Sequence, residues 1–588
     1  MASPEQRLKR FLHYGTEVPS YQPGNRLMSD AYQPTELPCI DAMIANEKAS
    51  DVVPCIVKAF SDGYSAHPEM LIYALAYCAK QKSNPQLTAA AYKALNTVCT
   101  TPESLFLFVK FVKKLSPTKS VWGAGIRKAV KEWYLKKDAK TLAEIVTTRK
   151  KYHRWSHKDI MRLIHLKAPD PEKSAIIKYV FYGITTAKKE FADVAEIGEV
   201  LNYIQSIDDF KKMTDTQQAV RTLEALHLTL DHVPPSMLKN REIWSVLIGN
   251  LPLRVLINNL ERLGYLGFLQ PESPLVPRVL DALRNERLIA ESRLHPAEVF
   301  VALKKYEMSS RYVPWNRNTS ARKIRLCQDC ESVEITRSNG VRTAIITSWL
   351  CYENRAVEAA KKRKERNGSG PVTTETTPPP KPNVQILMAM KELFIPTCKL
   401  LAPTGLRYMV TLHMKPFGWH GWERCFHGVK LMLLEAGLVT ALSLLHADRN
   451  VDVYRPFKTD TLTYLPIKLT TDMTVESALG VCMWPQPELP TYNPSSEIDW
   501  AKENNKQYDV FISIMARYNK TDSYLINKCL DSYRQSMNVP NAKVIILRLR
   551  SQSESAQASV VDHPGVLDIV GFDENVPRII EAFSRGAF

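Results

Sequence analysis

The 588-residue sequence has no hydrophobic run long enough to cross a bilayer, because its longest apolar stretch, residues 431–445, is interrupted by Glu435. The first residues, MASPEQRLKRF, contain no apolar core of a secretory signal. We therefore expect no membrane partner and a reducing compartment in which the cysteines stay free thiols. Cytoplasmic residence is the expectation, and a nuclear location is left open.

The sequence also lacks the motifs that mark common catalytic and cofactor sites. No GxGxxG or Walker loop follows an expected strand, and no G-x-S-x-G elbow is present. Cys327 and Cys330 form a lone CxxC, followed by Cys351, and no second CxxC or HxxxH pair completes a zinc set among the 11 cysteines. We expect no enzyme, no cofactor and no structural metal.

The sequence does have an excess of positive charge. It carries 78 Lys and Arg against 61 Asp and Glu, a net charge of +17, which favours a polyanionic partner. Residues 101–170 hold 17 Lys and Arg against 6 Asp and Glu, a local excess of +11. About two-thirds of the total excess thus lies in under one-eighth of the chain. Charge spread for solubility would not concentrate in this way.

Residues 149–167, RKKYHRWSHKDIMRLIHLK, interleave cations with flat rings. Tyr152, Trp155 and three histidines lie among the basic residues, and Asp159 is the one acid. Cations suit phosphate contacts and rings suit base stacking, so this segment predicts a nucleic-acid surface. The residues predicted to bind nucleic acid, here and in the preceding basic stretch, are Arg127, Lys128, Arg149, Lys150, Lys151, Arg154, Lys158, Arg162 and His165.

Three features of this region have structural alternatives that the sequence leaves open. Gly123 and Gly125 allow either close backbone approach to a partner or a helix–helix packing turn. Trp155, beside a capping Ser156, is favoured as a packed residue over a stacking platform. His165, among apolar neighbours, is either a half-buried histidine or an RNA contact.

Residues 1 to about 310 have the pattern of consecutive short amphipathic helices. Asn84-Pro85 and Thr101-Pro102 each begin one, because proline at the first helical position lacks only an N–H that would be unpaired anyway. Such a succession indicates an α-solenoid with degenerate repeats.

The basic segment itself is expected to contain one of these helices. Ser156 and Asp159 form a capping-box pattern that opens a helix over residues 158–166. Helical spacing would then place Lys158, Arg162 and His165 along one face.

From about residue 387 the pattern changes to apolar runs separated by helices. The expected strands are residues 407–413, 451–454, 508–515 and 542–549, and the expected helices are residues 427–446, 474–482, 522–535 and 576–585. This order predicts a parallel, doubly wound α/β domain. We therefore divide the chain into a helical domain at 1–350, a basic and Pro/Thr-rich linker or insertion at 351–385, and an α/β domain at 386–588.

The sequence resembles the TROVE-domain family, the relatives of the sixty-kilodalton Ro autoantigen in animals and bacteria. The stretch WSHKD at 155–159, with Arg162-Leu163 and His165-Leu166-Lys167 after it, carries the resemblance most specifically. Matching pieces keep their order and spacing from residue 7 to the carboxyl end, apart from about 310–385. They include RLKRFL at 7–12, MLIYAL at 70–75, EIW at 242–244, TTDMT at 470–474 and LD at 567–568.

This resemblance implies a ring of HEAT-like helical repeats followed by a von Willebrand factor A-like α/β domain. Family members bind small non-coding Y RNAs on the outer surface of the ring and take single-stranded 3′ ends of misfolded small RNAs through its central hole. The implied role is RNA stability and quality control within a ribonucleoprotein, by a monomeric protein and without a catalytic step.

The sequence departs from the family at the metal site of the A domain. The family's Asp-x-Ser-x-Ser falls on His413, Lys415 and Phe417, and a later aspartate falls on Ala516, although Thr491 matches a threonine of the site. One hydroxyl does not hold Mg²⁺, which needs several oxygen ligands. We expect this metal site to be lost.

A second departure lies in the Y RNA surface, where two basic family positions fall on Thr148 and Tyr152, while a histidine is retained as His165. The cations around them could restore the charge, so RNA binding is expected and the choice of RNA is left open. The rival interpretation is a protein-interaction scaffold. The missing metal motif favours that rival, and the basic cluster argues against it.

Overall fold

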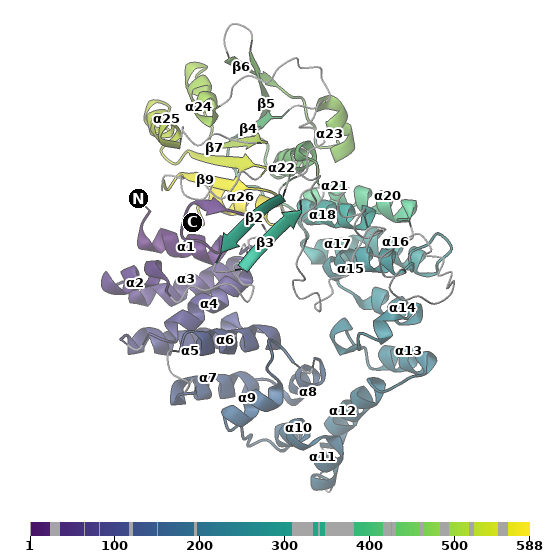
Figure 1. Cartoon of the computed structure of the whole chain (residues 1–588). Helices are drawn as coiled ribbons and strands as arrows, with labels where there is room; N and C mark the ends of the chain where they lie inside the picture. The colour runs from purple at the N-terminus through teal and green to yellow at the C-terminus, as the bar shows by residue number, and fades with distance from the viewer. Residues whose placement is uncertain are drawn as a thin grey trace, which may run out of the picture. The chain divides into compact units, whose positions relative to one another are not determined.

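The computed structural model describes residues 2–23, 36–63, 65–81, 83–116, 122–149, 151–192, 194, 197–308, 381–414, 425, 431–458, 462–482, 493–516, 523–550 and 563–588, with the backbone of 333–338 and 341–346. Residues 1–309 and 381–588 form one unit, and residues 310–380 a second (Figure 1). In the second unit, β2 (Val333–Ser338) and β3 (Val341–Ile346) pair as an antiparallel hairpin, where the sequence predicted no element.

The amino-terminal part of the first unit is a succession of short helices, as predicted. In chain order the helices are α1 (Pro4–Tyr14), α2 (Pro38–Ala45), α3 (Ala49–Asp62), α4 (Pro68–Cys78), α5 (Pro85–Val98), α6 (Pro102–Lys114), α7 (Ala124–Leu135), α8 (Ala139–Thr147), α9 (His157–Leu163), α10 (Pro171–Tyr182), α11 (Ile184–Glu190), α12 (Gly198–Phe210), α13 (Thr216–Ala225), the 3₁₀ turns η2 (Leu230–His232) and η3 (Met237–Lys239), α14 (Arg241–Asn250), α15 (Leu253–Tyr265), α16 (Leu275–Arg284), α17 (Glu286–Ser292) and α18 (Pro296–Glu307).

The predicted helix starts are confirmed, each with its cap. The Asn84 side chain accepts a hydrogen bond from the backbone N–H of Leu87 at the start of α5. At the start of α6, Thr101 and Ser104 form a reciprocal capping box. Both caps satisfy N–H groups that the helix itself leaves unpaired, so the starting points of these helices are encoded locally.

The capping box at Ser156 and Asp159 is also confirmed, but the helix that it opens is shorter than predicted. α9 ends at Leu163, three residues before the expected end, and His165 has a left-handed backbone with φ +50°. The N–H of Leu166 bonds to the carbonyl of Met161, and that of His165 to Arg162, a Schellman closure. Lys158 and Arg162 therefore share the helix, whereas His165 follows its end.

Packing runs from each helix to neighbours close in the chain, as in a solenoid. α3 packs on α5, α5 on α7, α8 on α10 and α12, α12 on α13, α13 on α14, α14 on α16 and α15 on α18. One apolar core extends from α1 to α12. A second continues from the end of α12 through α18 into the carboxyl-terminal domain. Burial of apolar surface between neighbouring helices therefore holds the body together.

The carboxyl-terminal part is an α/β domain, as predicted. Its elements are α20 (Val384–Glu392), α21 (Phe394–Cys398), β4 (Tyr408–His413), α22 (Leu433–Ala447), β5 (Val451–Lys458), β6 (Leu462–Pro466), α23 (Val475–Cys482), α24 (Pro494–Glu503), β7 (Val510–Met515), α25 (Ser523–Ser536), β8 (Lys543–Arg548), β9 (Val566–Val570) and α26 (Val576–Ser584).

The sheet has the order β1-β9-β8-β7-β4-β5-β6, where β1 is Ser20–Tyr21. All neighbours are parallel except β5 and β6, which are antiparallel. The four predicted strands are confirmed. These four strands are parallel, as predicted. The sequence missed β1, β6 and β9, and β6 returns antiparallel beside β5 as an edge hairpin.

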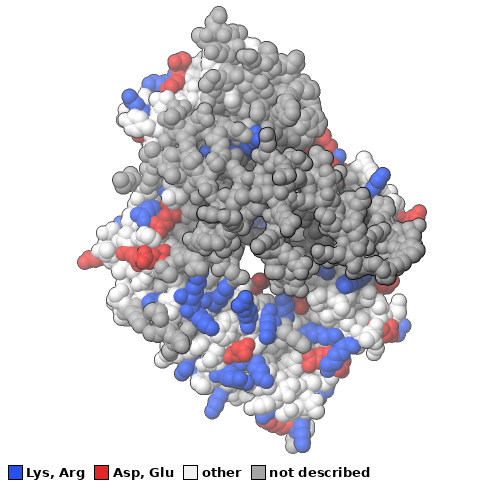
Figure 2. Space-filling view, in the orientation of Figure 1, with Lys and Arg blue, Asp and Glu red and all other residues white. Residues whose placement is uncertain are grey.

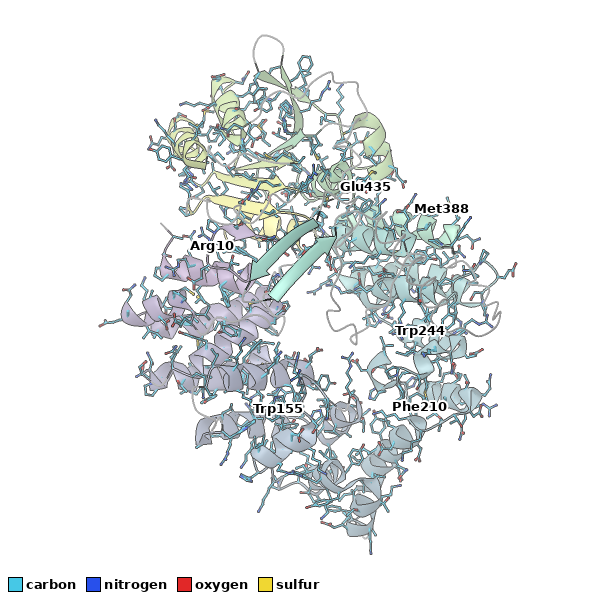
Figure 3. The ribbon with its side chains drawn as sticks, in the orientation of Figure 1. Arg10, Trp155, Phe210, Trp244, Met388 and Glu435 are labelled. Atoms are coloured by element: carbon cyan, nitrogen blue, oxygen red, sulfur yellow. The ribbon has the colours of Figure 1, made fainter. Side chains whose placement is uncertain are left out.

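Contacts between the helical body and the α/β domain close a circuit of packed elements, as the ring expectation requires. At one seam, β1 pairs with β9, and the Tyr21 hydroxyl donates to the Asp573 carboxylate at 2.7 Å. At the other, α18 packs on α20, α21 and α22, and Lys304 pairs with the buried Glu435 at 2.7 Å (Figure 3). The helical body thus begins and ends on the same sheet domain.

None of the described helices combines the length and the apolar composition that a bilayer crossing needs. The described cysteines are free thiols. Cys327, Cys330 and Cys351 lie outside the described residues.

Candidate nucleic-acid interface

The basic segment is built around a tight turn between α8 and α9. Tyr152 and Trp155 exchange two backbone hydrogen bonds, of 2.9 and 2.8 Å, and the two residues between them have positive φ, +47° at His153 and +72° at Arg154. This is the geometry of a type I′ turn. It leaves the side chains of His153 and Arg154 exposed at the tip.

The two rings at the base of the turn are packed. Tyr152 stacks on Phe106, with centroids 5.5 Å apart and an interplanar angle of 23°. Trp155 (Figure 3) meets the edge of Trp122 at 6.4 Å, and the Lys113 ammonium lies 5.2 Å from the centre of its ring. Trp155 is therefore a packed residue, the alternative that the sequence favoured, and it ties the turn to α6 and to the residues before α7.

Beneath the turn lies His157, the first residue of α9, which is buried. Its Nδ1 lies 2.9 Å from the Tyr134 hydroxyl, and its ring meets Phe106, Tyr134 and Tyr152 edge to face. Burial lowers the pKa of His157 to about 4, so the ring is neutral near pH 7. The turn thus rests on an aromatic cluster whose one titratable imidazole is kept uncharged.

The acid of the segment serves the helix start. The Asp159 carboxylate accepts hydrogen bonds from the backbone N–H of Ser156, at 2.9 Å, and from its hydroxyl, at 2.6 Å. The Ser156 hydrogen bonds hold the pKa of Asp159 below its ordinary value. The carboxylate is therefore directed at a backbone cap and stays ionised there.

Lys and Arg side chains gather on one face over α6 to α9 (Figure 2). Of the predicted residues, seven are exposed: Lys128, Arg149, Lys151, Arg154, Lys158, Arg162 and His165. Exposed cations on a rigid support are available to phosphate groups without a large loss of backbone entropy.

Two of these exposed cations, Arg149 and Lys158, have partners within the chain. The Arg149 guanidinium pairs with Asp231 at 2.9 Å, and both side chains are more than half exposed, so water screens the pair and phosphate can compete for it. The Lys158 ammonium donates to the Phe181 carbonyl at 2.7 Å, at the end of α10. Arg127 is half-buried, with its Nε lacking a hydrogen-bond partner among the described residues. Lys150 lies outside the described residues.

Sequence reasoning missed two lysines at this site. Lys113, at the end of α6, covers Trp155, and the basic window at 101–170 was the available signal for it. The Lys211 ammonium donates to the carbonyls of Thr147 and Thr148 at the end of α8. No local signal could have shown this contact, because it joins residues more than 60 positions apart.

The structure also distinguishes Gly123, the N-cap of α7, from Gly125 in the first turn of that helix. A Cβ on Gly125 would lie 2.6 Å from the ring of Tyr92, so this glycine serves helix packing. A Cβ on Gly123 would meet nothing within 4 Å. Close approach of backbone to a partner therefore stays open for Gly123.

The ends of β4 and β7, where the resemblance would place a metal site, do not fit Mg²⁺. His413 is paired in register with Met515, and Ala516 follows, so the described strand ends carry no carboxylate. Lys415, Phe417 and Thr491 lie outside the described residues. Mg²⁺ prefers an octahedral set of oxygens, which an imidazole, thioethers and a methyl group do not supply.

We predict that Mg²⁺ does not bind at these strand ends. Titration of MgCl₂ into chelator-treated protein, followed by calorimetry, should give only the heat of dilution at millimolar concentration. A variant that restores the motif, with His413→Asp, Lys415→Ser, Phe417→Ser and Ala516→Asp, serves as the comparison. Saturable heat from the unmodified chain, removed by His413→Ala, would contradict the prediction.

Comparison with known proteins matches two parts of the chain to family models. A model described as TROVE domain matches residues 42–364, and one described as Ro60 vWA domain matches residues 409–584. A crystal structure of the RO (RSR) protein of Deinococcus radiodurans superposes with a TM-score of 0.74 at 19% identity, over 100% of both chains. That agreement shows a common fold.

Two similar relatives carry the name RNA-binding protein RO60. The one from Caenorhabditis elegans is 22% identical over an alignment of 652 positions, which covers 99% of this chain and 88% of the relative. The one from Deinococcus radiodurans is 23% identical over an alignment of 604 positions, which covers 99% of this chain and 93% of the relative. Because the TROVE model spans more than half of the residues, the chain belongs to the TROVE-domain family and contains a vWA domain of the Ro60 type.

Proposed function

We propose that the chain is a non-enzymatic, RNA-binding component of a ribonucleoprotein. The RNA would be small and non-coding, of Y type on the basic surface, with the 3′ ends of misfolded small RNAs as further ligands. Its role would be RNA stability and quality control, exerted by a cytoplasmic monomer.

The observation that carries this proposal is the set of exposed cations on the turn and helix of the basic segment. Lys151, Arg154 and Arg162 are exposed within twelve residues, on α9 and on the turn before it, whose base is fixed by Phe106 and Trp122. Folded RNA is recognised by the spacing of its phosphates and by its shape, and a rigid array of cations suits that task. Relatives of similar length carry RNA binding in their names.

Crosslinking and sequencing of RNA bound to the protein in its native cells tests this function. We expect a few structured small RNAs to be strongly enriched with the unmodified chain. We expect this enrichment to disappear in a variant with Lys151→Gln, Arg154→Gln and Arg162→Gln. Recovery of only abundant background RNA with both proteins would contradict the proposal and favour the protein-interaction scaffold.

A further inference from the structure

Tyr182, the last residue of α10, is an aromatic side chain left in solvent. Its exposed fraction is 66%, whereas the large rings Trp133, Tyr134 and Trp244 of the same helical body are buried. Most of the surface of the Tyr182 side chain is therefore accessible to a ligand. The side chains around Tyr182 indicate which class of ligand its ring would bind.

Neighbouring side chains hold the Tyr182 ring in place. The Lys178 ammonium, one helical turn earlier, lies 4.6 Å from the ring centre, a cation–π contact. Lys178 is itself fixed by an ion pair of 2.5 Å with Glu190 on α11. The Phe181 ring lies 6.0 Å from that of Tyr182, tilted by 46°. A ring held in this way loses little conformational freedom when a flat ligand stacks on it.

Tyr182 adjoins the basic surface of α9. The Lys158 ammonium donates to the carbonyl of Phe181, the residue immediately before Tyr182. Arg162 lies one turn after Lys158 on the same helix. Lys188 and Lys189 follow on α11, with Lys189 exposed. The carboxylate of Glu190, the last residue of α11, is paired with Lys178. If the phosphates of an RNA bind α9, its next nucleotides would therefore lie near Tyr182, where the surrounding lysines attract the RNA backbone.

We propose that Tyr182 is a stacking platform for an unpaired nucleotide that flanks the RNA helix bound at α9. The inference rests on the proposed function and adds to it a contact, at Tyr182, for a nucleotide outside the paired stem. Stacking on tyrosine accepts any base, because every base presents a π face. The charge around Tyr182 favours a nucleic acid over an apolar protein segment as its occupant.

The test compares two RNAs that share one hairpin, the first blunt and the second with a single-stranded extension. With Tyr182→Ala, we expect affinity for the extended RNA to fall about tenfold, and affinity for the blunt hairpin to stay within about twofold of the unmodified protein. Tyr182→Phe keeps the ring and should bind both RNAs normally. Tyr524→Ala is the matched control, because Tyr524 is 73% exposed on α25 and should affect neither RNA. A 5-iodouridine in the extension should crosslink to the peptide that contains Tyr182.

The results separate this inference from the function beneath it. If both hairpins bind, and the binding depends on Lys151, Arg154 and Arg162, the proposed function holds whatever Tyr182 does. Equal affinity of Tyr182→Ala and the unmodified protein for the extended RNA overturns the stacking platform, as does an equal loss on both RNAs. If the unmodified protein binds neither hairpin, the function and the platform are overturned together.

Discussion

Replacing Lys151, Arg154 and Arg162 with glutamine will lower the affinity for a structured small RNA about 100-fold at near-physiological salt. All three side chains are exposed, and hydrogen bonds or rings fix the backbone of the turn that carries Arg154. Each phosphate contact releases close to one counterion, which corresponds to roughly fivefold in affinity per contact near 0.15 M salt. Three independent contacts multiply to about 100-fold.

The same variant makes a prediction about salt dependence that a general folding defect would not reproduce. A plot of the logarithm of affinity against the logarithm of salt concentration should become shallower by about 2 to 3. Fluorescence anisotropy with one labelled RNA, repeated at several salt concentrations, gives both the affinity and the slope. A loss of affinity at unchanged slope would contradict the phosphate assignment.

The choice of these three residues follows from the structure. Lys158 is left intact because its ammonium donates to the Phe181 carbonyl and supports the end of α10. Lys48, Lys58 and Lys528 are also exposed, on other elements, and their replacement by glutamine removes the same total charge. This control should stay within about threefold of the unmodified protein. An equal loss in both variants would mean that net charge, and not the surface over α6 to α9, determines binding.

Local signals explain what the sequence predicted correctly. Asn84, Thr101 and the pair Ser156 and Asp159 start their helices through hydrogen bonds that span three residues, so a short window contains the whole interaction. The strands β4, β7 and β8 were predicted because each is a continuous apolar run that also fits within a short window.

The missed features depend on contacts that no short window contains. β1 has two residues, too few for any periodicity, and exists because Ser20 pairs with Asp568 across most of the chain. The early end of α9 places His165 at a left-handed position that glycine usually occupies, so the usual stop signal is absent. The partners of Arg149 and Lys158 also lie outside a short window, so their ion pair and hydrogen bond were not foreseeable.

Acid should weaken the aromatic cluster under the basic turn, and His157 should account for about 2 kcal/mol of that loss between pH 7 and pH 5. Burial holds the pKa of His157 at about 4, against 6.5 for its ordinary value. The unfolded chain therefore binds a proton more readily than the folded chain. Stability is fully present above pH 6.5 and is lost as the pH falls from there toward 4. Burial also lowers the pKa of His13, His232 and His295, which adds to the same acid-dependent loss.

Comparison with a variant isolates the contribution of His157 from those of the other histidines. His157→Gln removes the titrating ring while keeping a side chain that can bond to the Tyr134 hydroxyl, which now lies 2.9 Å from Nδ1. The variant should be less stable at pH 7, since it loses the ring contacts with Phe106 and Tyr152. Its free energy of unfolding in urea should nevertheless fall by about 2 kcal/mol less than that of the unmodified protein between pH 7 and pH 5.

A second histidine in the same segment provides the control for this pH dependence. The side chain of His165 is exposed, so His165→Gln removes an imidazole without emptying a buried site. Tryptophan fluorescence can follow unfolding of this region, because Trp122, Trp133 and Trp155 lie around the turn and α7. Parallel pH curves for His157→Gln and the unmodified protein would show that His157 does not contribute to the loss of stability in acid. A reduced slope in His157→Gln alone would show that the surface proposed to bind RNA rests on a buried group whose charge state acid controls.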